Sequence, residues 1–375
     1  MRRAAAFLLA LALSGLSGCS RALLGNYRNI EELQVIQTLG LDGREGGVFV
    51  SFSTGRDASG REVVRMGAEG ESISGAMQAL QGYSVSGELF FSNTGYILLG
   101  EEAARDAGSC LDYIERASEI RLDTPLFVVR GAEAGPLVTA GGGEDGDITE
   151  IMSSLERFIE RRAAGYLPTC ADIARSLARS GAALVCAIAP ARAPDGEYLT
   201  AVSRGYAVLR AGELCGYVEG DAALAAAAFL GGAGEKYVEV DGMTLKLISC
   251  GARMEPVWDG GELAGLEMAL EVQASVIEAR SERDLNDEQE RSALEEALAG
   301  TAAGWMREVL DVSQGTGADF LGLGAELERC FPARWRDISP QWDELFPGLE
   351  IELSAGASVL RSYGFDSPPS RAGEG

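Results

Sequence analysis

Residues 266–276 read LEMALEVQASV, and every second residue from Leu266 to Val276 is apolar. Successive side chains of a β-strand point to opposite faces of the sheet. The pattern therefore predicts a long strand that buries one face and exposes the other. We expect the segments that flank this strand to form a sheet with it and a helix that packs on that sheet.

A long helix is expected after this strand, over residues 287–313, because apolar residues recur there every three or four positions. A last strand is expected over residues 349–359, where the alternation returns. A strand, a long helix and a second strand in succession predict a helix that packs on a sheet. The helical stripe comprises Leu294, Leu298, Ala302, Trp305, Val309 and Val312.

Two hairpins are expected before the long strand. Ala211-Gly212 separates apolar segments at 206–210 and 213–218, and Asp241-Gly242 separates 237–240 from 243–249. Asp-Gly between two such segments is a strong hairpin signal. Residues 203–365 are therefore expected to form a C-terminal domain, a curved and mostly antiparallel sheet that carries one long helix.

The segment from 33 to 195 mixes strand and helix patterns. Strands are expected near 33–41, 48–52, 90–91, 96–99, 126–129 and 183–189, and helices are expected between several of them. Asp147 followed by Glu150 has the pattern of a capping box, and Thr169 is placed to cap the next helix. Pro190, Pro194 and Gly196 interrupt the pattern, which predicts a domain boundary there. The fold class is α+β, with mostly antiparallel mixed sheets, packed helices and several domains.

The N-terminus reads as a bacterial lipoprotein signal peptide. Arg2 and Arg3 precede an apolar run of about ten residues, Ala4 to Leu13, which is too short to span a membrane. Leu16-Ser17-Gly18-Cys19 is the pattern that a lipoprotein signal peptidase cuts before the cysteine. We expect Cys19 to carry a diacylglyceryl lipid with fatty acids such as palmitate, which would anchor an extracytoplasmic protein to a membrane.

The expected organisation follows from these signals. It comprises a signal peptide at 1–18, a tether at 19–32, an N-terminal block at 33–195, a C-terminal domain at 203–365 and a disordered tail at 366–375.

Composition excludes several function classes. The formal net charge is −25, so binding to nucleic acid or electrostatic attraction to anionic lipid is not expected. The chain has no histidine, which removes Ser-His-Asp and Cys-His catalysis and every metal site that uses histidine. Composition therefore removes histidine-dependent catalysis and histidine-containing metal sites, but it does not exclude a mechanism that uses only carboxylates.

Two acidic stretches resemble metal-binding loops only superficially. Asp284, Asn286 and Glu288 have the spacing of a calcium loop, but Gln289 stands where the sharp turn needs glycine. The stretch from Asp145 to Glu150 fits a helix cap better than a metal site. Both are expected to begin helices.

The six cysteines other than Cys19 leave their oxidation state open. The compartment permits disulfides, yet the spacings are wide and no C-x-x-C motif occurs. Buried free thiols are the favoured interpretation, and one or more disulfides are the alternative. These residues are Cys110, Cys170, Cys186, Cys215, Cys250 and Cys330.

The chain from Cys19 to about Gly364 resembles the Ger(x)C family of spore germination lipoproteins, the C subunits of germinant receptors. Gly40-Leu41-Asp42 and Leu98–Ala104, which reads LLGEEAA, are similar to motifs of the N-terminal half. The segment from Gly205 to Gly216 is similar to the family's hairpin. PARW at 332–335 and WDELFP at 342–347 resemble the signature before the last strand, and Asp319 lies where the family often has Asp.

The resemblance implies a receptor subunit rather than an enzyme, with no catalytic residue, no metal and no cofactor. Such a subunit would lie on the outer face of the spore inner membrane and would work with an A subunit and a polytopic B subunit to respond to nutrients. The family fold implies three small α+β domains, which would divide the first block in two. The germinant, and whether this subunit contacts it directly, stay open.

Three aromatic residues near the C-terminus, Trp335, Trp342 and Phe346, have two interpretations. They close the core beneath the last strand, or they form an interface with the partner subunits, where aromatic residues are enriched. Two other functions also stay open, a membrane-tethered hydrolase of the cell wall and a solute-binding lipoprotein. The hydrolase would need a pair of carboxylates, and no pair stands out.

Overall fold

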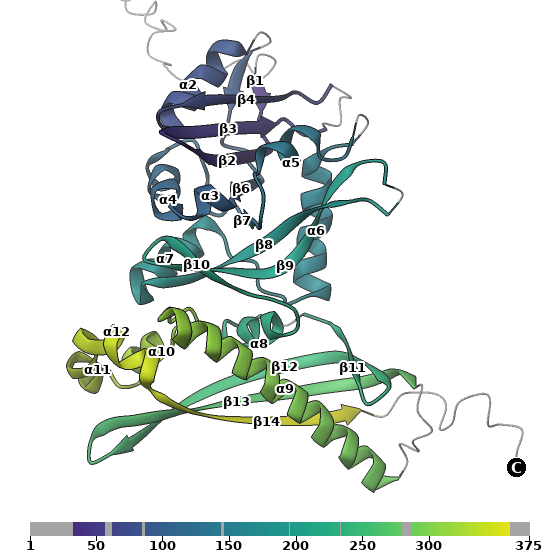
Figure 1. Cartoon of the computed structure of the whole chain (residues 1–375), viewed down its shortest axis with the longest axis vertical. Helices are drawn as coiled ribbons and strands as arrows, with labels where there is room; N and C mark the ends of the chain where they lie inside the picture. The colour runs from purple at the N-terminus through teal and green to yellow at the C-terminus, as the bar shows by residue number, and fades with distance from the viewer. Residues whose placement is uncertain are drawn as a thin grey trace, which may run out of the picture.

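The structure is a computed structural model that describes residues 33–56, 62–84, 87–143, 146–194, 196–232, 234–279 and 287–360. An eight-stranded sheet with helices on both faces occupies one end of the long axis, and a four-stranded sheet occupies the other (Figure 1). The predicted signal peptide, the tether with Cys19 and the C-terminal tail lie outside the described residues.

The eight-stranded sheet has the strand order β10-β9-β8-β7-β6-β2-β3-β4. Its four central strands, β8, β7, β6 and β2, are parallel to one another, and antiparallel hairpins flank them on both sides. The strands are β2 (Thr38–Arg44), β3 (Gly47–Ser53), β4 (Arg65–Gly70), β6 (Tyr96–Gly100), β7 (Leu126–Val129), β8 (Ala182–Arg192), β9 (Leu199–Arg210) and β10 (Glu213–Val218).

Helices cover both faces of this sheet because its central strands are apolar on both sides. Ile97 and Leu99 of β6 pack in one hydrophobic cluster, and Leu98 between them packs in the other. The first cluster includes α2 (Ile73–Tyr83), α3 (Glu101–Ala104), α4 (Ala107–Arg116) and α7 (Cys170–Ser180), whereas the second includes α5 (Gly135–Ala140) and α6 (Ile148–Arg162). A short parallel pair, β1 (Leu33–Val35) and β5 (Glu88–Phe90), completes this part.

Asp147 and Thr169 cap helices as predicted, but the reciprocal capping box expected between Asp147 and Glu150 is not formed. The Asp147 carboxylate accepts a hydrogen bond from the backbone N–H of Thr149 at 3.2 Å and begins α6. Thr169 and Asp172 form a reciprocal capping box at the start of α7. Gly181 ends α7 in the left-handed conformation, with φ of 68°, which glycine adopts without a steric cost.

The sheet of the N-terminal half continues beyond residue 195, where the sequence pattern predicts a domain boundary. β8 and β9 form a continuous hairpin in which Arg192 pairs with Leu199, so the expected boundary at 195–203 falls inside it. Pro190 is tolerated because it lies beyond the part of β8 that pairs with β7, where its missing N–H is not needed. The first sheet therefore ends only at Val218.

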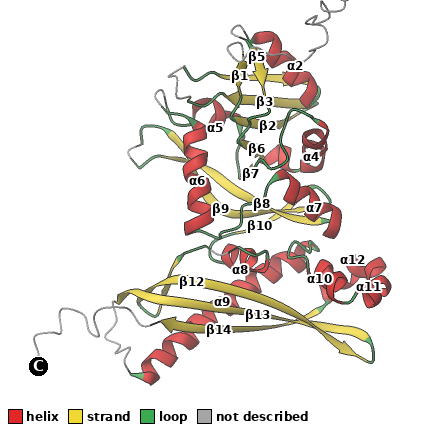
Figure 2. Ribbon diagram, turned by 180° about the vertical axis from the view of Figure 1, so that it is seen from behind, coloured by secondary structure: helices red, strands yellow, loops and turns green. Residues whose placement is uncertain are grey.

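The C-terminal sheet has the order β11-β12-β13-β14 and carries α9 on one face, as predicted (Figure 2). The predicted stripe of α9 is buried from Leu294 to Val309. β14 pairs with β13 in parallel, and α9 is the crossover that such a pair requires. The elements are α8 (Ala222–Phe229), β11 (Tyr237–Val240), β12 (Met243–Asp259), β13 (Glu262–Ala279), α9 (Glu288–Thr316), α10 (Leu323–Cys330), α11 (Pro332–Ile338), α12 (Trp342–Leu345) and β14 (Glu350–Leu360).

Candidate functional site

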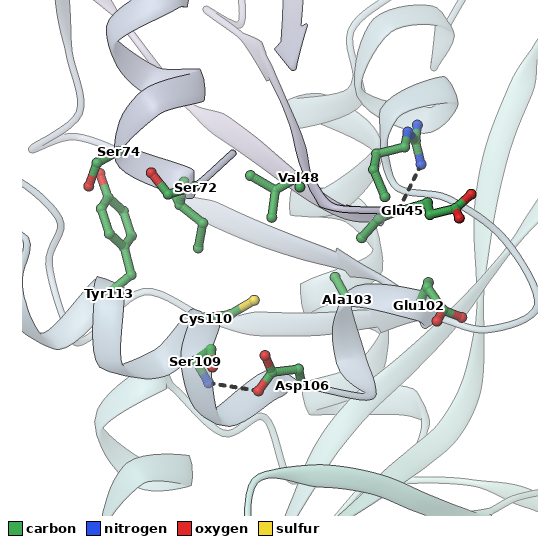
Figure 3. Close-up of a pocket in the computed structure, with 14 residues that line it drawn as sticks. Glu45, Val48, Ser72, Ser74, Glu102, Ala103, Asp106, Ser109, Cys110 and Tyr113 are labelled. Atoms are coloured by element: carbon green, nitrogen blue, oxygen red, sulfur yellow. Dashed lines mark hydrogen bonds between the residues drawn. The ribbon is translucent and has the colours of Figure 1, made fainter. Parts of the chain in front are cut away.

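A pocket of about 800 Å³ opens between the turn that joins β2 to β3 and the first turns of α2 and α4 (Figure 3). Val48, Ala103 and Cys110 supply apolar surface to its lining. The polar lining comprises Arg44, Glu45, Ser72, Ser74, Glu102, Asp106, Ser109 and Tyr113. No sequence motif marks this pocket, because its walls come from segments that lie far apart in the chain.

Several polar groups of the pocket are already engaged. Ser72 accepts a hydrogen bond from the N–H of Gly75 at 3.1 Å, and Asp106 accepts one from Ser109 at 3.4 Å, so both cap helices. Arg44 forms an ion pair with Glu133 at 2.8 Å. The lining contains three acidic residues, Glu45, Glu102 and Asp106, but only one arginine, Arg44. This negative balance favours a ligand that carries positive charge.

The Cys110 thiol in this pocket is not suited to nucleophilic chemistry. Burial, with a smaller contribution from the negative charge of Asp106, raises the pKa of Cys110 to about 12. A thiol is reactive as its thiolate, and this one stays protonated at neutral pH. Among the described residues, no group of His, Cys, Asp and Glu side chains could hold a metal ion.

Asp42 lies against Gly100, so it links two of the motifs that resemble the Ger(x)C family, Gly40-Leu41-Asp42 and LLGEEAA. Its buried carboxylate accepts hydrogen bonds from the backbone N–H groups of Ala134 at 2.7 Å and Gly135 at 2.8 Å, at the start of α5. A β-carbon at Gly100 would collide with this carboxylate, so the glycine of the LLGEEAA motif makes room for it. Burial raises the pKa of Asp42 although these hydrogen bonds favour its charged form.

In the C-terminal half, Asp319 also accepts hydrogen bonds from backbone N–H groups at the start of a helix. Its carboxylate accepts hydrogen bonds from the N–H groups of Leu323 and Gly324, each at 2.8 Å, and from the indole N–H of Trp342 at 3.1 Å. Burial raises the pKa of Asp319 and outweighs these three contacts. The carboxylate thus joins the end of α9, the start of α10 and α12.

The predicted interface aromatics lie mainly in the core. Trp342 is 6% exposed and Phe346 is 1% exposed, and their ring centroids are 5.5 Å apart. Trp335 is half-buried and packs edge-on against Trp342 at 5.4 Å. This arrangement agrees with the interpretation in which they close the core. A contact between Trp335 and a partner subunit stays a prediction.

The six described cysteines are free thiols. Cys110, Cys170, Cys186 and Cys250 are buried, whereas Cys215 and Cys330 are exposed. Burial raises the pKa of Cys170 to about 12 and that of Cys250 to about 11.

A short pulse of iodoacetamide at neutral pH is expected to label Cys330 at least about a hundredfold faster than Cys170. Cys330 is exposed, whereas Cys170 is buried and becomes accessible only through local unfolding. Peptide mapping by mass spectrometry measures both rates. In concentrated guanidinium chloride the two rates should converge. Equal labelling of Cys170 and Cys330 in the native protein would contradict the described core.

Cys19, the predicted lipid site, lies outside the described residues, as do Asp284 and Asn286 of the calcium-like stretch. Asp287 caps α9, accepting hydrogen bonds from Gln289 at 2.7 Å and Glu290 at 3.3 Å. No helix of the described segments is long and apolar enough to cross a membrane.

Comparisons with known proteins agree in their assignment. Residues 26–188 match the family model described as the spore germination protein N-terminal domain. Residues 204–363 match the model described as spore germination B3/GerAC like, C-terminal. The chain is 21% identical over 394 residues to spore germination protein KC of Bacillus subtilis (strain 168), and the alignment covers 95% of each chain.

A solved structure has a similar fold. The crystal structure of the GerBC protein superposes with a TM-score of 0.52 at 16% sequence identity, covering 88% of this chain and 100% of that one. The two family models follow one another along nearly the whole described chain, and the fold agrees with a solved structure. The chain belongs to the Ger(x)C family of spore germination proteins.

Proposed function

We propose that this chain is the lipid-anchored C subunit of a spore nutrient germinant receptor. It assembles with A and B subunits on the outer face of the spore inner membrane, and the assembly triggers germination when a nutrient is sensed. The observation that carries the proposal is the consecutive match of both germination-protein domain models, at 26–188 and 204–363.

The geometry supports a subunit that acts by contact rather than by catalysis. The carboxylates of Asp42, Asp147 and Asp319 all accept hydrogen bonds from backbone N–H groups; that of Asp147 accepts one from Arg56 at 2.9 Å. The buried thiols are held protonated. The three carboxylates could otherwise act as acid or base, but they are held in structural hydrogen bonds, and the protonated thiols are poor nucleophiles.

Membrane attachment is proposed through the lipid on Cys19, because the segment around it has the order of a lipoprotein signal. The strong negative charge makes electrostatic attachment to anionic lipid unfavourable. The lipid would thus supply the affinity and leave the protein surface free for the other subunits.

The test is a pull-down of the tagged chain from detergent-solubilised spore inner membranes, with the co-purified proteins identified by mass spectrometry. The expected result is recovery of one polytopic subunit and one further germination subunit. An unrelated tagged spore lipoprotein should recover neither. Recovery of the chain alone under mild detergent would argue against assembly. Release of wall fragments by the purified chain would instead support the hydrolase.

A further inference from the structure

β14 is an open edge of the C-terminal sheet. It pairs with β13 on one side, and it is the outermost strand in both views (Figures 1 and 2). The register with β13 is unbroken from Glu350 to Leu360. An unpaired strand edge presents a row of backbone donors and acceptors, which can pair with another strand.

Hydrogen bonds at the two ends of β14 show which groups face outward. The side-chain amide of Gln314 in α9 donates to the carbonyl oxygen of Leu349 at 2.8 Å, and the N–H of Val359 donates to Oε1 of Glu295 in α9 at 2.9 Å. Alternate residues of a strand direct their N–H and C=O groups to the same side. Those of residues 351, 353, 355 and 357 therefore also face away from β13. Within the described ranges, no residue accepts a hydrogen bond from these four N–H groups.

Sequence features protect the free part of the opposite edge of this sheet, whereas the middle of β14 lacks them. β12 extends beyond its short pairing with β11, and its free edge carries Arg253, Glu255 and Pro256 together with shifts in register. Charges, proline and bulges are common protections against strand addition. In β14, residues 353–358 read LSAGAS, without charge, proline or register shift.

The outer face of the sheet carries a row of like charges that ends at this edge. Glu255 lies directly opposite Glu267, and Glu267 lies directly opposite Glu352. All three are exposed, and the next outward position along β14 is Glu350. Like charges in directly opposed positions destabilise a sheet. A strand added beside β14 would place side chains next to Glu352 and Glu350, where basic residues would offset this repulsion.

We propose that the open edge of β14 binds an extended segment of a partner protein as a fifth strand, and that this segment carries basic side chains at alternate positions that meet Glu350 and Glu352. Backbone hydrogen bonds to residues 351–357 give affinity, and the charge pattern gives selectivity. The inference rests on the proposed assembly with other subunits and names the chemistry of one contact.

A dye-labelled peptide of about nine residues, with alternating lysine and valine and blocked ends, tests the proposal. Fluorescence anisotropy measures its binding to the full-length chain in detergent. Saturable binding is expected. Replacement of the lysines by glutamate, or N-methylation of alternate backbone amides, should each weaken it at least about tenfold, which corresponds to about 1.4 kcal/mol.

Variants of the chain locate the contact. Glu350→Lys combined with Glu352→Lys, and separately Ala355→Pro, should each weaken binding by about tenfold or more. Proline is tolerated on an edge strand where its N–H would face solvent, and circular dichroism verifies the fold. The matched control is Glu69→Lys with Glu71→Lys, an exposed acidic pair of the same spacing at the edge strand β4 of the other sheet, which should leave binding unchanged.

Three results would overturn the proposal. One is the lack of saturable binding, and another is binding that ignores both N-methylation and Ala355→Pro, which would reveal attraction by charge alone. The third is a homodimer of the chain that Ala355→Pro dissociates, which would assign the edge to a second copy. None of these results depends on the other receptor subunits, so the peptide-binding test and the pull-down can fail independently of each other.

Discussion

Replacement of Asp319 by alanine is expected to lower the free energy of unfolding by about 3–5 kcal/mol. The carboxylate is 3% exposed and accepts hydrogen bonds from Leu323, Gly324 and the indole of Trp342. Alanine leaves all three donors without this acceptor in a buried site, and each unsatisfied donor costs about 1–3 kcal/mol. The loss is expected to stay below the plain sum because part of the site can relax or admit water.

Urea unfolding, followed by tryptophan fluorescence and by circular dichroism, measures the change. Asp343→Ala is the matched control, because Asp343 lies next to Trp342 in the chain but is exposed, and it should change stability by less than about 0.5 kcal/mol. Asp319→Asn should fall between the two, since its amide keeps one acceptor oxygen but turns an NH₂ group towards a donor. A loss below about 1 kcal/mol for Asp319→Ala would mean that the carboxylate does not join these helices.

Local signals predicted the C-terminal sheet well. The alternation of 266–276 lies within β13, and Asp241-Gly242 forms the turn between β11 and β12, with φ of 49° and 74°. Both patterns are decided by neighbouring residues, which a sequence displays directly. The length of β12 was underestimated, because Gly251 and Pro256 disturb its alternation although pairing with β13 continues through them.

Pairing between distant segments could not be predicted. Nothing in the local pattern of β14 distinguishes a parallel from an antiparallel neighbour, and the parallel centre formed by β2, β6, β7 and β8 is set by crossover helices. The turn near 195 was interpreted as a linker for the same reason. A turn between two paired strands and a linker between two domains have similar compositions, and only the partner strand separates them.

The candidate sites also contain features that local motifs mark and features that only the tertiary structure shows. Asp42, Gly100 and Asp319 fall in motifs similar to those of the Ger(x)C family, but their role as acceptors for backbone N–H groups needed the structure. The pocket lined by Ser72 and Asp106, and the row of glutamates that ends at Glu352, depend on tertiary proximity and register. No local pattern carries that information.

Replacement of Cys19 by serine is expected to abolish lipid attachment completely. The predicted thioether needs the cysteine sulfur, which serine lacks, so neither diacylglyceryl transfer nor the cleavage that follows it should occur. One acyl chain holds a protein only marginally, with an association constant of about 10⁴ M⁻¹, whereas two give stable anchoring. Wild-type protein should incorporate an alkyne analogue of palmitate and remain with membranes after an alkaline wash. The Cys19→Ser chain should incorporate none and keep the mass of its uncleaved precursor.

Ser20→Ala is the matched control, because it changes the neighbouring residue and leaves the sulfur in place. If the lipid holds the subunit beside its partners, spores with Cys19→Ser should lose nutrient germination by about tenfold or more and keep their response to triggers that bypass the receptors. Palmitate-free wild-type protein would contradict the lipid anchor. Normal nutrient germination by the unlabelled Cys19→Ser variant would show instead that contacts of the folded domains are sufficient for assembly. That result would direct attention to surfaces such as the open edge of β14.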